Sequence, residues 1–172
     1  MMLNVGNKVV YPNQGPCRIG AVVEKAFGGR PVSFYTFAIM DDSGDVLFVP
    51  VDKITTLGIR QLMEKSEIPK LLSRLSQAAK TPGVPTAKNW KQRAIDNSKR
   101  LASGSVFDLA EIVESLTELN ETRVLAPHDR QALQRARKLL VCEIAEVLGE
   151  TISAAEERLD KALSGAQSRM TK

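Results

Sequence analysis

Few residues in this chain of 172 could carry out acid–base or nucleophilic chemistry. There is one histidine, His128, and the two cysteines, Cys17 and Cys142, lie far apart with no histidine near either. Catalytic triads and metal sites need several such groups close together, and the common phosphate-binding, hydrolase and metalloprotease motifs are absent. The sequence therefore predicts a protein that is not an enzyme and has no metal or other cofactor. The cysteine usage predicts reduced thiols and a cytoplasmic protein.

Positive charge is concentrated in one short window. Residues 86–104 carry five basic side chains and one acidic one, a net charge of +4 that equals the net charge of the whole chain. Such a local excess is typical of a surface that binds nucleic-acid phosphates, because the bound cations release condensed counterions. The next window, residues 105–127, is acidic, so a solvated helix balanced by its neighbour explains the charge equally well. The basic residues of the window are Lys88, Lys91, Arg93, Lys99 and Arg100.

The only tryptophan, Trp90, lies inside this basic window. At helical spacing it shares a side with Ala87, Ala94 and Leu101, which favours a place in the core. Its position after a Pro-rich stretch, with Arg93 one turn further on, instead suits an aromatic wedge that enters a base step from the minor groove. Periodicity alone favours the core, and the wedge is the alternative.

Composition divides the chain into two modules. Residues 1–58 hold six of the eight aromatic residues and seven of the eleven glycines, whereas the remainder is rich in helix-forming residues. Short β-forming runs between turn sequences predict four or five antiparallel strands in a small barrel of the SH3 or Tudor kind. The connections are too short for a parallel sheet. The strands are expected at residues 8–11, 18–24, 32–39 and 46–51.

From Leu57 onward the apolar residues recur at helical spacing. One helix is expected to begin after Ser66, and another is expected at residues 90–103, with Asn89 as its N-cap and Gln92 as the reciprocal partner in a capping box. Gly104 and Gly149 are expected to end helices. The remaining helices are expected at residues 106–119, 127–148 and 151–163. The predicted fold is α+β and mainly α, with a barrel domain at residues 1–65 and a compact bundle of four or so helices at residues 66–172.

Six short motifs recur in the order of one known family, from residue 3 to about residue 165. They are Val5–Pro12 followed by Gly15, Phe48–Pro50, Leu57–Arg60, Asn89–Trp90 with Arg93, Leu101–Val106 and Arg135–Leu140. Together they resemble the CarD/CdnL family of bacterial transcription regulators. The first motif is shared with the polymerase-binding domain of transcription-repair coupling factors, but the motifs of the second half are specific to CarD-like proteins.

This resemblance implies a Tudor-like domain that binds the β subunit of RNA polymerase. It also implies a helical domain that contacts promoter DNA at the upstream edge of the bubble. There a tryptophan that matches Trp90 wedges into the minor groove and stabilises the open complex. The family's polymerase contacts match Lys25, Phe37, Phe48 and Pro50. Its DNA contacts match Trp90 and Arg93, and the charge of the window adds Lys91, Lys99 and Arg100 as phosphate contacts.

Three positions depart from the family pattern. Asn7 lies where an acidic residue is usual, Phe48 where some relatives have Arg, and Gln92 where a basic residue is frequent. A polymerase contact at Phe48 is therefore expected to be apolar rather than ionic. The chain is expected to be a monomer with no membrane partner. The alternative function is a free-standing, non-specific DNA-binding or adaptor protein that does not need polymerase.

Overall fold

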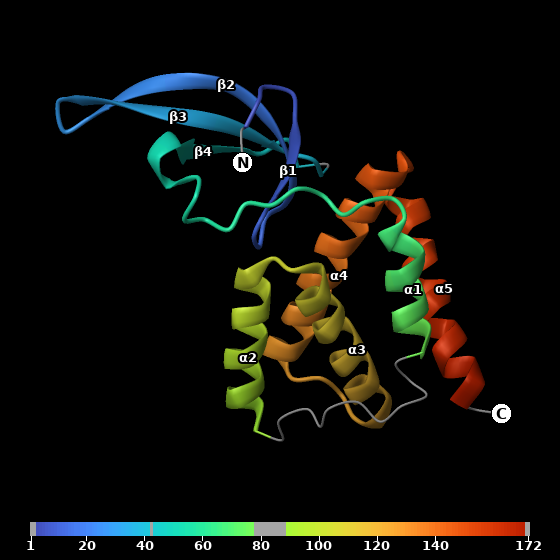
Figure 1. Cartoon of the computed structure of the whole chain (residues 1–172). Helices are drawn as coiled ribbons and strands as arrows, with labels where there is room; N and C mark the ends of the chain where they lie inside the picture. The colour runs from blue at the N-terminus through green and yellow to red at the C-terminus, as the bar shows by residue number, and fades with distance from the viewer. Residues whose placement is uncertain (1–2, 42, 78–88, 171–172) are drawn as a thin grey trace.

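The computed structural model describes residues 3–41, 43–77 and 89–170 of the chain. A four-stranded antiparallel sheet comes first, and five α-helices follow it among the described residues. The sheet lies across one end of the helices (Figure 1). The predicted α+β, mainly α class is therefore confirmed. None of the described helices combines the length and the apolar character needed to cross a membrane.

The sheet is a meander in the order β1-β2-β3-β4, with every neighbouring pair antiparallel. All four predicted strands are present, but β2 and β3 are longer than expected and form a hairpin that projects beyond the helices (Figure 1). An isolated bridge between Val10 and Arg60 adds the outgoing chain to the free edge of β1. No ladder of the described residues joins β4 back to β1. The strands are β1 (Lys8–Tyr11), β2 (Gly15–Phe27), β3 (Arg30–Ile39) and β4 (Val46–Pro50), and a 3-10 turn, η1 (Val51–Lys53), follows them.

The helices pack around α4, which contacts α2, α3 and α5 and also reaches β2. Their core is apolar and fully buried, with Ile112, Leu116, Leu140, Ile144 and Leu159 at its centre. The last helix extends beyond the predicted end at residue 163. The helices are α1 (Glu67–Gln77), α2 (Trp90–Ser103), α3 (Val106–Thr122), α4 (Pro127–Leu148) and α5 (Ile152–Met170).

Helix α2 begins and ends where the sequence predicts. The Asn89 side chain accepts a hydrogen bond from the backbone N–H of Lys91 at 2.9 Å, which is the expected N-cap. The capping box is wrong, because the Gln92 amide donates to Asp96 at 2.9 Å instead of returning to Asn89. Gly104 ends the helix with φ 69°, and a Cβ there would lie 3.0 Å from the Cα of Pro12. This position therefore requires glycine for both its backbone angle and its close approach to the sheet.

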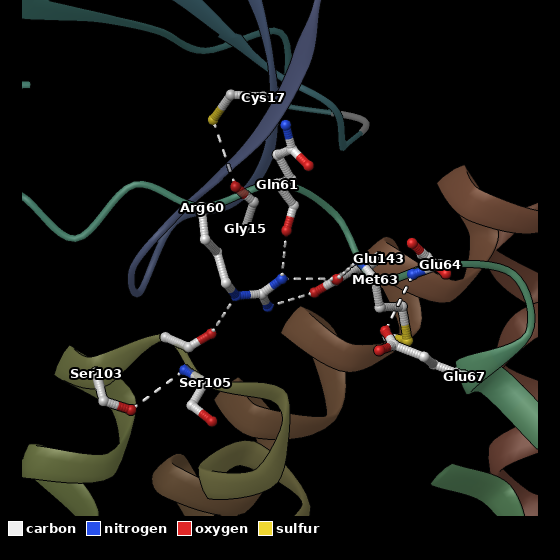
Figure 2. Close-up of polar contacts among 11 residues, drawn as sticks. Gly15, Cys17, Arg60, Gln61, Met63, Glu64, Glu67, Ser103, Ser105 and Glu143 are labelled. Carbon is white, nitrogen blue, oxygen red and sulfur yellow. Dashed lines mark hydrogen bonds and ion pairs between the residues drawn. The ribbon is translucent and has the colours of Figure 1, made fainter. Parts of the chain in front are cut away.

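A buried ion pair joins the sheet module to the helices (Figure 2). The guanidinium of Arg60 donates to both carboxylate oxygens of Glu143 on α4, at 2.9 and 2.7 Å, and its Nε donates to the carbonyl of Gly104 at 2.9 Å. The backbone N–H of Met63 also donates to Glu143, at 2.8 Å. Because the Glu143 side chain is almost fully buried, these bonds are needed to offset its desolvation. They fix the orientation of the sheet on the bundle.

Candidate functional site

One candidate surface is the face of the sheet that points away from the sheet core. The register pairs Thr36 with Phe48 and Phe34 with Pro50, and side chains paired in this way point to the same face. The Phe48 ring is 48% exposed on this face. The ammonium group of Lys25 lies 3.6 Å from the centroid of the Phe48 ring, which is a cation–π contact. Lys25, Phe48 and Pro50 therefore lie together, as the resemblance implies. We call this the outer face.

Phe37 does not belong to the outer face. It pairs with Leu47 on β4, one residue out of step with Phe48, and its side chain is fully buried. Its neighbours in the sheet core include Ile19 and Val49. Successive side chains of a strand point to opposite faces, so Phe37 cannot contact a partner on the face that presents Phe48. The expectation that Phe37 is a polymerase contact is wrong, and Phe37 is a core residue.

Two aromatic residues of the outer face were missed in the sequence. Phe27 lies at the end of β2 and is 62% exposed, and its ring centroid is 5.8 Å from that of Phe34. The Phe27-Gly28-Gly29-Arg30 stretch was interpreted only as a turn. Phe48 pairs with Thr36, and Phe34 lies two residues before Thr36 on β3, so Phe34 points to the same face as Phe48. This pairing of β3 with β4 cannot be read from the sequence.

The second candidate surface lies at the start of α2, which begins at the end of the bundle far from the sheet (Figure 1). Trp90 occupies the first position of this helix and is 49% exposed, so it is not a core residue. Its ring is stacked on the ring of His128 with an interplanar angle of 16° and a centroid distance of 6.1 Å. The ammonium group of Lys91 lies 5.7 Å from the same ring. Ala87, expected on the same side of the helix, lies outside the described residues.

Arg93 does not face solvent as a phosphate contact would. Its side chain is 5% exposed, and its Nη2 lies 3.0 Å from Oδ2 of Asp129, which is 2% exposed. The helical period turns Arg93 toward α4, whereas Trp90 and Lys91 remain outside. A cation that is neutralised by a buried carboxylate is not available to DNA. The expectation that Arg93 contacts phosphate is therefore wrong in this structure, and Arg93 joins α2 to α4.

The other basic residues of α2 differ in their surroundings. Arg100 is partly buried and donates to the side chain of Asn97 at 2.8 Å. Lys91 and Lys99 are exposed, and neither forms an ion pair with another described residue. The positive charge that α2 offers to a partner therefore comes mainly from these two lysines. Lys88 lies outside the described residues.

A shallow cavity of about 440 Å³ lies between Trp90 and the connection from α3 to α4. We call residues 123–128 the α3–α4 corner. Arg123, Val124 and His128 of this corner line the cavity, and Val124 is 88% exposed. His128 is exposed in the first turn of α4. Its closeness to Trp90 is a tertiary contact without a local sequence signal.

The described residues contain no cluster of three or more His, Cys, Asp or Glu side chains that could hold a metal ion. Both cysteines are buried, and burial raises the pKa of the Cys17 thiol to about 12. The two candidate surfaces present exposed aromatic rings with lysines beside them, and apolar side chains, which are groups suited to binding a partner.

Comparison with known proteins gives matches over both modules. Residues 3–63 match the family described as "CarD-like/TRCF RID domain", and residues 70–160 match "CarD, C-terminal domain". A protein of Bacillus subtilis (strain 168), YdeB, whose name describes it as a candidate transcription factor, is 25% identical over 150 residues, which are 87% of this chain and 95% of the relative. The solution structure of the 72-residue N-terminal domain of Myxococcus xanthus CarD is 40% identical and covers 35% of this chain and 79% of that domain, with a TM-score of 0.29.

Proposed function

Because this chain belongs to the CarD family of transcription regulators, we propose that it acts at promoters by binding RNA polymerase and DNA together. In this proposal residues 1–65 bind the β subunit of RNA polymerase, and residues 66–172 contact promoter DNA at the upstream edge of the bubble. The protein works as a monomer in the cytoplasm, without a cofactor and without chemistry of its own.

The outer face supports the polymerase half of the proposal. The CarD-like/TRCF RID domains are a family known for interaction with RNA polymerase. Exposed aromatic side chains dominate the energy of many protein interfaces, and Phe48 and Phe27 are exposed here around the partly buried Pro50. The β4 strand is also the free edge of the sheet. These features suit a protein partner better than a nucleic acid.

A single observation carries the DNA half: the only tryptophan of the chain is half-exposed at the start of a helix, and the ammonium group of the exposed Lys91 lies beside its ring. An apolar ring of this size is costly to leave in water unless it meets a partner. A planar wedge flanked by cations can enter a base step from the minor groove while the cations contact phosphates. Such contacts carry little sequence specificity, which fits a protein that acts at many promoters.

Neither surface needs to bind tightly by itself. Once the sheet module is bound to polymerase, the helical module is held beside the promoter at a high effective concentration. A wedge that binds melted DNA more tightly than closed DNA then shifts the equilibrium toward the open complex by the difference in affinity. The result is a longer lifetime of the open complex.

The experiment that tests this proposal replaces Trp90 with Ala in the full chain. Trp90 is a surface residue, so the free energy of unfolding should change by less than about 0.5 kcal/mol. Binding to polymerase should be unchanged, and the lifetime of promoter open complexes should fall toward the value without the protein. Ile95→Ala is the matched control, because Ile95 is an exposed apolar residue of the same helix. An unchanged lifetime would overturn the wedge, and DNA binding without any effect of polymerase would support the free-standing alternative.

A further inference from the structure

The burial of Arg93 changes where the DNA surface can lie. On helix α2 itself Lys91 lies beside the Trp90 ring, whereas Lys99 is about two and a half turns further on and on the other side of the helix. The arginine of α2 nearest to Trp90, Arg93, is neutralised by Asp129. The α3–α4 corner lines the same cavity as Trp90. The residues of that corner therefore decide what a partner meets next to the wedge.

His128 is in a position to hold the Trp90 ring. The two rings are stacked nearly parallel, and both side chains are exposed rather than packed in the core. The Arg93–Asp129 ion pair lies directly beneath them: Arg93 is one turn after Trp90 on α2, and Asp129 follows His128 on α4. This buried pair fixes the first turn of α2 against the first turn of α4. The contact between the two rings is thus built on a rigid base.

Arg123 supplies the cation that Arg93 cannot. It follows the last residue of α3, its side chain is exposed, and it lines the cavity together with Trp90. Among the described residues Arg123 has no ion pair with a carboxylate. The charge pattern of the sequence does not indicate Arg123 as a DNA contact, because it is the only basic residue in the acidic stretch 105–127.

We propose that the α3–α4 corner is the second half of the DNA-binding surface, with His128 holding the Trp90 ring in the orientation that enters DNA and Arg123 contacting a phosphate. This inference rests on the proposed function. His128 is a positioning residue: by restricting the ring before binding, it lowers the entropy cost of inserting it. Arg123 adds a positive charge at the cavity that Trp90 lines, beside the charge that Lys91 places at the ring from α2.

The first experiment measures the orientation of Trp90 directly. Because the chain has one tryptophan, its fluorescence reports on Trp90 alone. His128→Ala should make the fluorescence more accessible to acrylamide and shift its emission to longer wavelength. It should shorten the open-complex lifetime by about two- to tenfold, as expected for the loss of an aromatic pair. His128→Phe keeps a ring at this position and should restore both properties. A merely structural role of His128 would change thermal stability without this spectroscopic signature and without rescue by Phe.

The second experiment measures the phosphate contact. Arg123→Ala in the full chain should lower the slope of log K against log salt for duplex DNA by about 1. Lys161→Ala is the control, because Lys161 is an exposed lysine of α5 that forms no ion pair with another described residue, and it should leave the slope unchanged. An equal effect of both variants would mean a general effect of net charge, and no effect of Arg123→Ala would remove Arg123 from the surface.

These outcomes separate the corner from the proposed function. If Trp90→Ala leaves the open-complex lifetime unchanged, the proposed function fails, whatever the corner does. If Trp90→Ala shortens the lifetime but His128→Ala and Arg123→Ala both behave as wild type, the proposed function stands and the inference about the corner is wrong.

Discussion

The outer face of the sheet and the start of α2 are built from the same local pair, an exposed aromatic ring with a lysine above it. The Lys25 ammonium group lies 3.6 Å from the Phe48 ring centroid, and the Lys91 ammonium group lies 5.7 Å from that of Trp90. Their surroundings differ. Phe48 belongs to an extended apolar face, whereas the neighbours of the single Trp90 ring include His128 and the Lys91 ammonium group. An apolar patch suits a protein interface and an isolated ring among cations suits nucleic acid.

In both regions a buried residue lies next to an exposed residue of the candidate surface. Both Phe37 and Arg93 are buried beside an exposed site residue. Phe37 on β3 pairs with Leu47, the neighbour of Phe48 on β4, and Arg93 lies one turn after Trp90 on α2. Phe37 fills the sheet core, while Arg93 forms a buried ion pair with Asp129. Each region therefore has an exposed residue for binding and a buried neighbour that holds it in place. Mutating the exposed residues and the buried residues separately tests this comparison.

The largest expected effect is on the sheet. Phe37→Ala removes a fully buried ring and should lower the free energy of unfolding by about 3–5 kcal/mol. Phe48→Ala should leave stability nearly unchanged and weaken binding to polymerase by about 1–3 kcal/mol. Chemical denaturation and a polymerase-binding titration measure the two quantities. A Phe37→Ala variant that is fully stable, or a Phe48→Ala variant that binds polymerase normally, contradicts the division of the sheet into these two faces.

Among the helices, the loss of the buried Arg93 side chain should lower the free energy of unfolding by a similar amount. Arg93→Met leaves the Asp129 carboxylate buried without its partner and should cost about 3–5 kcal/mol of stability. The double variant Arg93→Met/Asp129→Leu removes both charges and should recover most of this loss, because a buried ion pair is often no more stable than a well-packed apolar pair. If Arg93→Met is instead fully stable and binds DNA more weakly, Arg93 contacts phosphate and its pair with Asp129 does not hold α2 against α4.

How much the sequence could predict follows from these same residues. The strands and helices were predicted nearly in full, because turn residues, the Asn89 cap and Gly104 act locally. The exposure of Trp90 was predicted by the family resemblance against the periodicity, and its position at the first turn explains why the apolar side of α2 does not bury it.

Residues whose surroundings are set by tertiary contacts could not be predicted in this way. The burial of Phe37 depends on which β4 residue it faces, and that of Arg93 depends on Asp129, which is 36 residues away. Glu143 gave a weak signal, since a carboxylate inside the apolar stripe of α4 indicates a buried partner, but the sequence does not name Arg60 as that partner.

A smaller effect concerns the charge that is left on α2. Reversing Lys91 and Lys99 to Glu should lower the slope of log K against log salt for duplex DNA by about 2, while binding to polymerase is unchanged. The control is the reversal of Lys70 and Lys161, which makes the same change in net charge on other exposed helix surfaces. Equal losses in the two double variants would show that DNA responds to the total charge of the protein. If only the α2 double variant loses DNA binding, then DNA binds at α2 and not at the outer face of the sheet.

The smallest effect concerns the contact that holds the two regions together. Asp41, in the turn between β3 and β4, accepts hydrogen bonds from Ser43 and lies 3.3 Å from the Lys138 ammonium group on α4. The Ser43 hydroxyl, more than Lys138, holds the pKa of Asp41 below its usual value. A carboxyl group with a lowered pKa stabilises the folded state at neutral pH, and this contribution disappears as the pH falls through the lowered pKa. Asp41→Asn should therefore reduce stability by less than about 1 kcal/mol near pH 7, since Lys138 is half-exposed.

The pH dependence gives this small effect a distinct signature. The stabilities of wild type and Asp41→Asn, measured by urea denaturation from pH 7 down to pH 3, should converge below about pH 4, the usual value for an aspartate. Ser43→Ala should remove most of this pH dependence, because the hydroxyl is the largest cause of the lowered Asp41 pKa, and Lys138→Met should remove less of it. If the wild-type and Asp41→Asn curves stay parallel through this range, Asp41 does not titrate with folding. The ionic contact of Asp41 to α4 then contributes nothing, and the ion pairs left to orient the sheet on α4 are Arg60–Glu143 and Lys8–Glu146.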